Sequence, residues 1–191
     1  MVISNKHKYI YIANPKTGTN SVERLLVNDY AGSTRHDSPT IEKHTGSKWI
    51  LAHSPSDYYS FSFVRNPWGR LVSWYGMLQK NFPDEHHNFK EYLLSNLGLT
   101  DSELYESYPG IPQRHWCAGV DFVGKYENLY SDLNKVFKHL GLPTVNASDV
   151  PVKNVSKHRD YTSGYYTDYL KDAVAELCAW EIEKFGYEFG E

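Results

Sequence analysis

The sequence predicts an α/β protein with three layers, in which a mostly parallel central sheet carries helices on both faces. Two observations support this fold class. Short apolar runs rich in aromatic and β-branched residues alternate along the chain with longer segments of helical periodicity. Two of these runs end at a break that leads directly into a helix-like segment, as in sheets whose parallel strands are joined by helices. Ligands of such sheets bind at the carboxyl ends of the strands, so a functional site is expected there.

Strands are expected where short apolar runs end at chain breakers, and helices where apolar residues recur every three or four positions. The helix after Val64 has the clearest start, because Asn66 is a suitable N-cap and the first helical turn tolerates Pro67. Gly141 and Gly186 are clear stop signals for two later helices. In chain order, the expected elements are a strand at 8–13, a helix at 19–29, a strand at about 39–43, a helix at about 47–54, a strand at 60–65, helices at 67–80 and 88–97, a strand at 121–125, and helices at 127–140 and 167–185.

Length and composition indicate a single globular domain over 1–191. The chain has 40% hydrophobic and 23% charged residues, which is ordinary for a globular protein with a substantial core. Its formal net charge of −3 argues against a nucleic-acid partner held by bulk electrostatics. The two cysteines, Cys117 and Cys178, form neither a disulfide framework nor a zinc motif, so both are expected to be reduced.

Membrane association is not expected. No run approaches the roughly 18 apolar residues of a membrane span, and no signal peptide is visible. We therefore expect a cytoplasmic protein with small-molecule ligands, and the sequence indicates no particular oligomeric state.

Residues 15–21, Pro-Lys-Thr-Gly-Thr-Asn-Ser, separate the first strand from the first helix. A strand that breaks at Pro15 and restarts as a helix near Thr19 leaves main-chain N–H groups at a helix N-terminus, where the helix dipole favours an anion. Lys16 adds a positive charge, and Gly18 lets the backbone approach a ligand closely. This stretch therefore predicts a site for a phosphate-like group. Hydroxyl groups that can add hydrogen bonds belong to Thr17, Thr19 and Ser21.

A second strand–helix junction predicts a second anion site. Arg65 lies at the carboxyl end of a strand, and Ser73 lies about two turns along the helix that follows. An arginine fork with a serine hydroxyl is a good receptor for a terminal phosphate.

Taken together and in this order, the two stretches resemble the PAPS-dependent sulfotransferase family. The first is similar to the family's loop for the 5′-phosphosulfate of PAPS (3′-phosphoadenosine-5′-phosphosulfate). The second is similar to its 3′-phosphate motif, in which Arg and Ser are eight positions apart. The resemblance covers nearly the whole chain and is closest in kind to compact carbohydrate-type sulfotransferases of bacteria and phages. Further stretches that carry it are Ile111-Pro112-Gln113, Val120 to Leu129, Tyr165-Tyr166-Thr167 and Phe185-Gly186-Tyr187.

The resemblance implies a P-loop-like sulfotransferase fold and transfer of a sulfuryl group from PAPS to a hydroxyl of a carbohydrate, rather than of a phenol or steroid, with PAP as the product. It implies no metal. Lys16 is implied to stabilise the departing phosphate and is therefore assigned as catalytic. Residues implied to bind the donor are Pro15, Lys16, Thr17, Gly18, Thr19, Asn20, Ser21, Arg65 and Ser73.

The acceptor hydroxyl needs a general base, for which the family usually employs histidine. His44 is the leading candidate, because residues 40–44 look like a strand that runs out into a loop upstream of the arginine motif. His53 is the rival, in Ala52-His53-Ser54-Pro55, although it leaves no room for a helix before the strand at 60–65. We also expect residues 76–116 to form one wall of the acceptor cleft, with a plain structural insertion as the alternative.

Two other functions stay open. One is a non-catalytic nucleotide- or glycan-binding protein on the same scaffold. The other is a P-loop-type kinase, suggested by Gly119 to Lys125, which matches the first seven positions of the nucleotide-binding motif. Tyr126 stands where that motif requires Ser or Thr, and the interior of the run is β-like. We therefore expect this run to be the end of a strand.

Overall fold

The computed structural model describes residues 1–29, 33–35, 44–82, 88–96, 112–146, 161–162 and 164–190. The strand expected at 39–43 lies outside these residues. The chain divides into two compact units, one made of Met1–Arg65 and Gln113–Lys153, the other of Asn66–Pro112 and Asn154–Glu191. The assignment of the whole chain to a single domain stays a prediction.

The first unit contains a five-stranded sheet of order β3-β1-β2-β4-β5. β2 pairs with β4 and β4 with β5 in parallel, while β1 is antiparallel to both of its neighbours. All strands except β1 therefore run in one direction, and the expected mostly parallel sheet is confirmed. The strands are β1 (Val2–Ser4), β2 (Tyr9–Ile12), β3 (Ser33–Arg35), β4 (Tyr59–Val64) and β5 (Phe122–Lys125).

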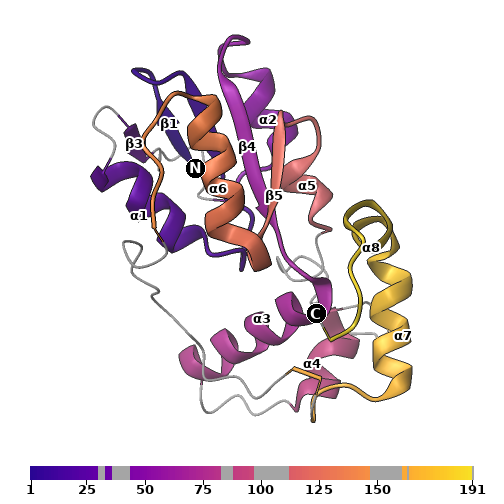
Figure 1. Ribbon diagram of the computed structural model, residues 1–191. Coiled ribbons are helices and arrows are strands. Elements are labelled where there is room, and N and C mark those ends of the chain that lie inside the picture. Colours follow the sequence, from indigo (N-terminus) through magenta and orange to yellow (C-terminus); the bar gives the residue numbers. More distant parts are fainter. Residues whose placement is uncertain are drawn as a thin grey trace. The chain divides into compact units, whose positions relative to one another are not determined.

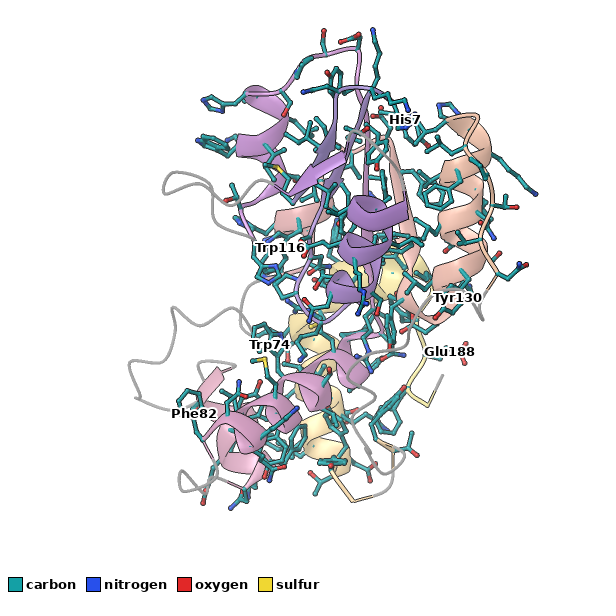
Figure 2. The ribbon with its side chains drawn as sticks, turned by 90° about the vertical axis from the view of Figure 1, so that its left-hand side faces the viewer. His7, Trp74, Phe82, Trp116, Tyr130 and Glu188 are labelled. Carbon is teal, nitrogen blue, oxygen red and sulfur yellow. The ribbon has the colours of Figure 1, made fainter. Side chains whose placement is uncertain are left out.

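Helices cover both faces of this sheet, which confirms the three-layer α/β prediction (Figure 1). α1 (Thr19–Asp29) and α6 (Leu129–His139) lie on one face, and α2 (Ser47–Ala52) and α5 (Arg114–Cys117) lie on the other. In Figure 2, Trp116 of α5 and Tyr130 of α6 lie on opposite sides of the sheet. Buried residues on the α1–α6 face form one core, which includes Tyr9, Tyr11, Leu25, Leu26, Phe61, Phe63, Leu133, Val136 and Phe137.

Short elements account for the differences from the expected pattern. The first expected strand is the second arm of a hairpin, because Val2 of β1 pairs with Tyr11 of β2. β3 and α5 were also not expected, since three or four residues are too few to show a period. A 3-10 turn, η3 (Tyr126–Asn128), precedes α6. The P-loop-like run ends in β5, as expected, and forms no phosphate loop.

The second unit is helical in its described part. It contains α3 (Pro67–Asn81), α4 (Phe89–Asn96), α7 (Asp168–Leu177) and α8 (Ala179–Phe185). The start of α3 is as expected: Pro67 is its first residue, and the Asn66 side chain accepts a hydrogen bond from Trp68 N. The single helix expected at 167–185 is divided at Cys178. The core of the second unit is rich in aromatic residues, and its members include Trp68, Leu71, Trp74, Tyr75, Phe89, Tyr92, Leu93, Leu170 and Val174.

Both cysteines are free, as expected; Cys117 is buried and Cys178 is half-buried. Among the described helices, none has the length and apolar character that crossing a membrane requires.

Candidate active site

Three strands of the first unit end at one edge of the sheet. The parallel register pairs Ile12 of β2 with Ser62 of β4, and Val64 of β4 with Lys125 of β5. The residues that follow these strands therefore leave the sheet at the same edge. They include the loop before α1, Arg65 and Tyr126, so the topology brings the first anion loop to Arg65.

The loop before α1 is tightly wound. Lys16 has φ +67° and Gly18 has φ +77°, both in the left-handed region. For a residue with a side chain, this conformation costs about 1 kcal/mol or more, and such strain tends to gather at functional sites. A Cβ on Gly18 would lie 3.2 Å from side-chain atoms of Leu129 and Tyr126. The loop therefore requires glycine at position 18 for its conformation and for its close packing.

The polar side chains of this loop differ in what they can offer a ligand. Thr17 is fully buried, and its hydroxyl donates to Asn14 O at 2.8 Å, so it holds the loop. Thr19 is also buried, whereas Asn20 is exposed. The main-chain N–H of Ser21 donates to Gly18 O at 3.0 Å. The hydroxyl of Thr17 and the amide of Ser21 are thus used inside the fold, so the predicted anion would have to contact the earlier amides of the loop and Lys16.

Lys16 and Arg65 are neighbours at this edge. Arg65 Nη1 donates to Lys16 O at 3.2 Å, and the Arg65 Cζ lies 4.4 Å from the centre of the Tyr126 ring. A guanidinium over an aromatic face is held by a cation–π interaction. Burial, and secondarily the charge of Arg65, lower the pKa of Lys16 from 10.5 to about 8. The site therefore places two cations close enough to disfavour each other's charge.

The backbone of Arg65 is fixed by a side chain that sequence reasoning did not assign to the site. Gln113 Oε1 accepts from Arg65 N at 2.9 Å, and Gln113 Nε2 donates to Arg65 O at 2.8 Å. The same Oε1 accepts from Asn14 Nδ2 at 3.1 Å, and Asn14 Nδ2 also donates to Phe63 O at 2.8 Å. Gln113 and Asn14 are buried, so this network ties the loop after β2 to the end of β4. The signal available in the sequence was the Ile-Pro-Gln stretch that contains Gln113.

His44 lies at the same edge of the sheet. Its Nδ1 is 2.7 Å from Ala13 O, the carbonyl of the residue that follows β2. A carbonyl oxygen only accepts, so Nδ1 carries a proton, and in the neutral ring Nε2 is the basic nitrogen. The main chain of His44 is also held, because Trp116 Nε1 donates to His44 O at 2.7 Å.

His53 lies elsewhere in the first unit. It follows α2 and precedes the amino end of β4, which begins at Tyr59. Its ring is exposed, stacks on Trp49 with centroids 4.2 Å apart, and has Nδ1 2.8 Å from Trp49 O. The structure thus brings His44, Lys16 and Arg65 to one edge and leaves His53 outside that group.

Ser73 belongs to the second unit. It lies in α3 and is buried. The chain passes from one unit to the other between Arg65 and Asn66. The pairing of Ser73 with Arg65 around one phosphate therefore stays a prediction.

Comparison with known proteins identifies the family. A sequence model of the sulfotransferase family matches residues 1–188, and the chain belongs to that family. An uncharacterized protein of Archaeoglobus fulgidus is 40% identical over 89 residues, which cover 45% of this chain and 70% of that protein. Carbohydrate sulfotransferase 14 of Danio rerio is 24% identical over 178 residues, which cover 75% of this chain and 48% of that protein. The chain thus spans about half the length of this second relative.

Proposed function

We propose that this protein transfers a sulfuryl group from PAPS to a hydroxyl group of a carbohydrate. The observation that carries the proposal is the pairing of Lys16 and Arg65 beside a helix N-terminus, at the edge of the sheet where parallel strands end. Membership of the sulfotransferase family supports a transferase. The carbohydrate acceptor is supported by the similarity to a relative named as a carbohydrate sulfotransferase.

The residues present suit an anionic donor. Lys16 and Arg65 repel each other, and burial disfavours the charge on Lys16, so a bound anion would offset both effects. The loop amides and Lys16 would hold the 5′-phosphosulfate, and Arg65 with Ser73 would hold the 3′-phosphate. When bound, the donor supplies a sulfuryl group on a good leaving group, the 5′-phosphate.

Two side chains act on the reacting atoms in this proposal. His44 accepts the proton of the acceptor hydroxyl at Nε2, while the hydroxyl oxygen bonds to sulfur and the bond from sulfur to the phosphate oxygen breaks. Lys16 stabilises the negative charge that develops on the departing phosphate. The strained loop and the Gln113 network hold these groups before the donor arrives, so little reorganisation is needed during the reaction.

The test is transfer of labelled sulfuryl from PAPS to a panel of acceptors that contains polysaccharides, phenols and steroids. We expect labelled carbohydrate with the wild-type protein and a loss of about 10²-fold to 10⁴-fold with His44→Ala. His53→Ala is the matched control, since it removes a histidine from the same unit outside the site. Labelled phenol without labelled carbohydrate would contradict the acceptor class, and no transfer to any acceptor by a protein that binds PAP would contradict the activity.

A further inference from the structure

α5 is a helix of four residues, Arg114–Cys117, preceded directly by Gln113. It packs against α2 and β4, and Trp116 N donates to Gln113 O at 2.9 Å. Gln113 and Trp116 are both buried, the indole completely. The Gln113 side chain forms hydrogen bonds with Arg65, and the Trp116 side chain forms one with His44.

Gln113 contacts the donor side of the site. Its amide group bonds both the N–H and the carbonyl of Arg65, and its oxygen also accepts from Asn14. A side-chain amide suits this pattern, because it carries an acceptor and a donor on two neighbouring atoms and so bonds both main-chain groups of Arg65 at once. Gln113 thus fixes the main chain from which the Arg65 guanidinium reaches Lys16 O.

Trp116 contacts the segment that carries His44, the proposed general base. Its indole N–H donates to the carbonyl of His44, whose ring in turn donates to Ala13 O. The start of α2 is attached to the same helix, because Ser47 Oγ lies 3.2 Å from His115 O and 2.7 Å from Ala118 O. Residues 44–47 are therefore held to α5 by both of their ends.

We propose that Gln113 and Trp116 are positioning residues. Through them, α5 and the residue before it fix the positions of Arg65 and His44 relative to each other. This inference rests on the proposed sulfotransferase function. It assigns two separable effects, one on donor binding and one on the chemical step. A misplacement of about 1 Å in a reacting group can reduce a rate by about 10²-fold, so small shifts at either residue should be measurable.

The first arm of the test is Gln113→Met, which keeps the length of the side chain and removes its hydrogen bonds. We expect the Kd for PAP and the KM for PAPS to rise about tenfold, and we expect no further rise when Gln113→Met is added to Arg65→Ala. Asn134 offers a matched control, because its side-chain amide bonds the N–H and the carbonyl of Val145 in the same way, on α6. Asn134→Leu should lower the thermal stability and leave PAP affinity unchanged.

The second arm is Trp116→Phe, which keeps an aromatic ring and removes the bond to His44. We expect kcat to fall about 10-fold to 100-fold while PAP affinity stays within about twofold of wild type. In a His44→Ala background, Trp116→Phe should cause no further loss of kcat, because its effect passes through His44. If Trp116 had a purely structural role, the double variant would lose kcat by the product of the two single losses.

The outcomes separate this inference from the proposed function. A wild-type protein that neither binds PAP nor transfers sulfuryl overturns the function itself. An active wild type in which the Gln113 and Trp116 effects multiply with those of Arg65 and His44 overturns the positioning roles alone. If Gln113→Met does not fold, Gln113→Glu serves, since it keeps the oxygen and removes the donor to Arg65 O. If Trp116→Phe does not fold, Ser47→Ala serves instead, because it removes the other attachment of residues 44–47 to α5. It should likewise lower kcat in the wild type and cause no further loss of kcat in the His44→Ala background.

Discussion

The lowered pKa of Lys16 predicts that donor-product affinity depends on pH above neutrality. At a pKa of about 8, Lys16 is protonated in about 90% of ligand-free molecules at pH 7 and in about 10% at pH 9. PAP binds best to the protein in which Lys16 is protonated, because the positive ammonium group attracts the negative phosphate of PAP. The affinity for PAP should therefore fall about tenfold from pH 7 to pH 9, a loss of about 1.4 kcal/mol.

Calorimetry measures this effect together with its cause. The bound anion raises the pKa of Lys16 again, so binding at pH 9 should take up nearly one proton, and binding at pH 7 should take up almost none. Titrations in buffers of different ionisation enthalpy report this proton uptake directly. The phosphates of the nucleotide ionise near pH 6, so they contribute little over this range. Lys16→Met should bind weakly and without pH dependence. An affinity that is constant from pH 7 to pH 9, or the same decline in Lys16→Met, would refute the placement of Lys16 in a buried site beside Arg65.

The same pKa carries a consequence for stability. The folded-state pKa of Lys16 lies below the unfolded value of 10.5, so the charged lysine destabilises the ligand-free protein below about pH 8. This destabilisation is relieved as the pH rises from about 8 towards 10.5. It amounts to at most about 3 kcal/mol, and to less because the side chain is partly exposed. Urea unfolding at pH 7 should show Lys16→Met to be more stable than the wild type, and the difference should shrink by pH 10.

Four further substitutions have distinct expected outcomes. Arg65→Ala should weaken PAP binding by tenfold or more in calorimetry, because a charge-assisted hydrogen bond contributes about 1.5–3 kcal/mol, and an unchanged Kd would argue against the 3′-phosphate role. His44→Ala should keep PAP affinity and lose most of its kcat, while His53→Ala stays close to wild type in both; the opposite pattern would move the base role to His53. Gly18→Ala should lower both the melting temperature and PAP affinity, because it combines φ +77° with contacts of 3.2 Å to Leu129 and Tyr126. A melting temperature equal to wild type would show that the loop relaxes more easily than its geometry indicates.

Local patterns predicted the parts of the fold that lie within a few residues of a chain break. The start of α3 at Pro67 and the start of α1 at Thr19 could be expected because capping and turn preferences act over one helical turn. The short elements β1, β3 and α5 could not, because their formation depends on pairing and packing with distant segments.

The candidate site shows the same division. Lys16 and Arg65 could be proposed from their positions at strand–helix junctions, but their proximity depends on the parallel pairing of β2 and β4. Gln113 bonds residues that are 48 and 99 positions away in the chain, which no local pattern reveals. Gln113 and Trp116 belong to a stretch that we expected to line the acceptor cleft, whereas both are buried and form hydrogen bonds to the main chains of Arg65 and His44.

The most direct test of the central claim compares PAP with AMP by calorimetry on the wild-type protein and on Arg65→Ala. The two nucleotides differ only in the 3′-phosphate, so the comparison isolates the feature that distinguishes a PAPS site from a general phosphate site. We predict that PAP binds at least tenfold tighter than AMP to the wild type, and that Arg65→Ala removes most of this difference. Equal affinities for PAP and AMP in the wild type would contradict the assignment of a PAPS donor to this site.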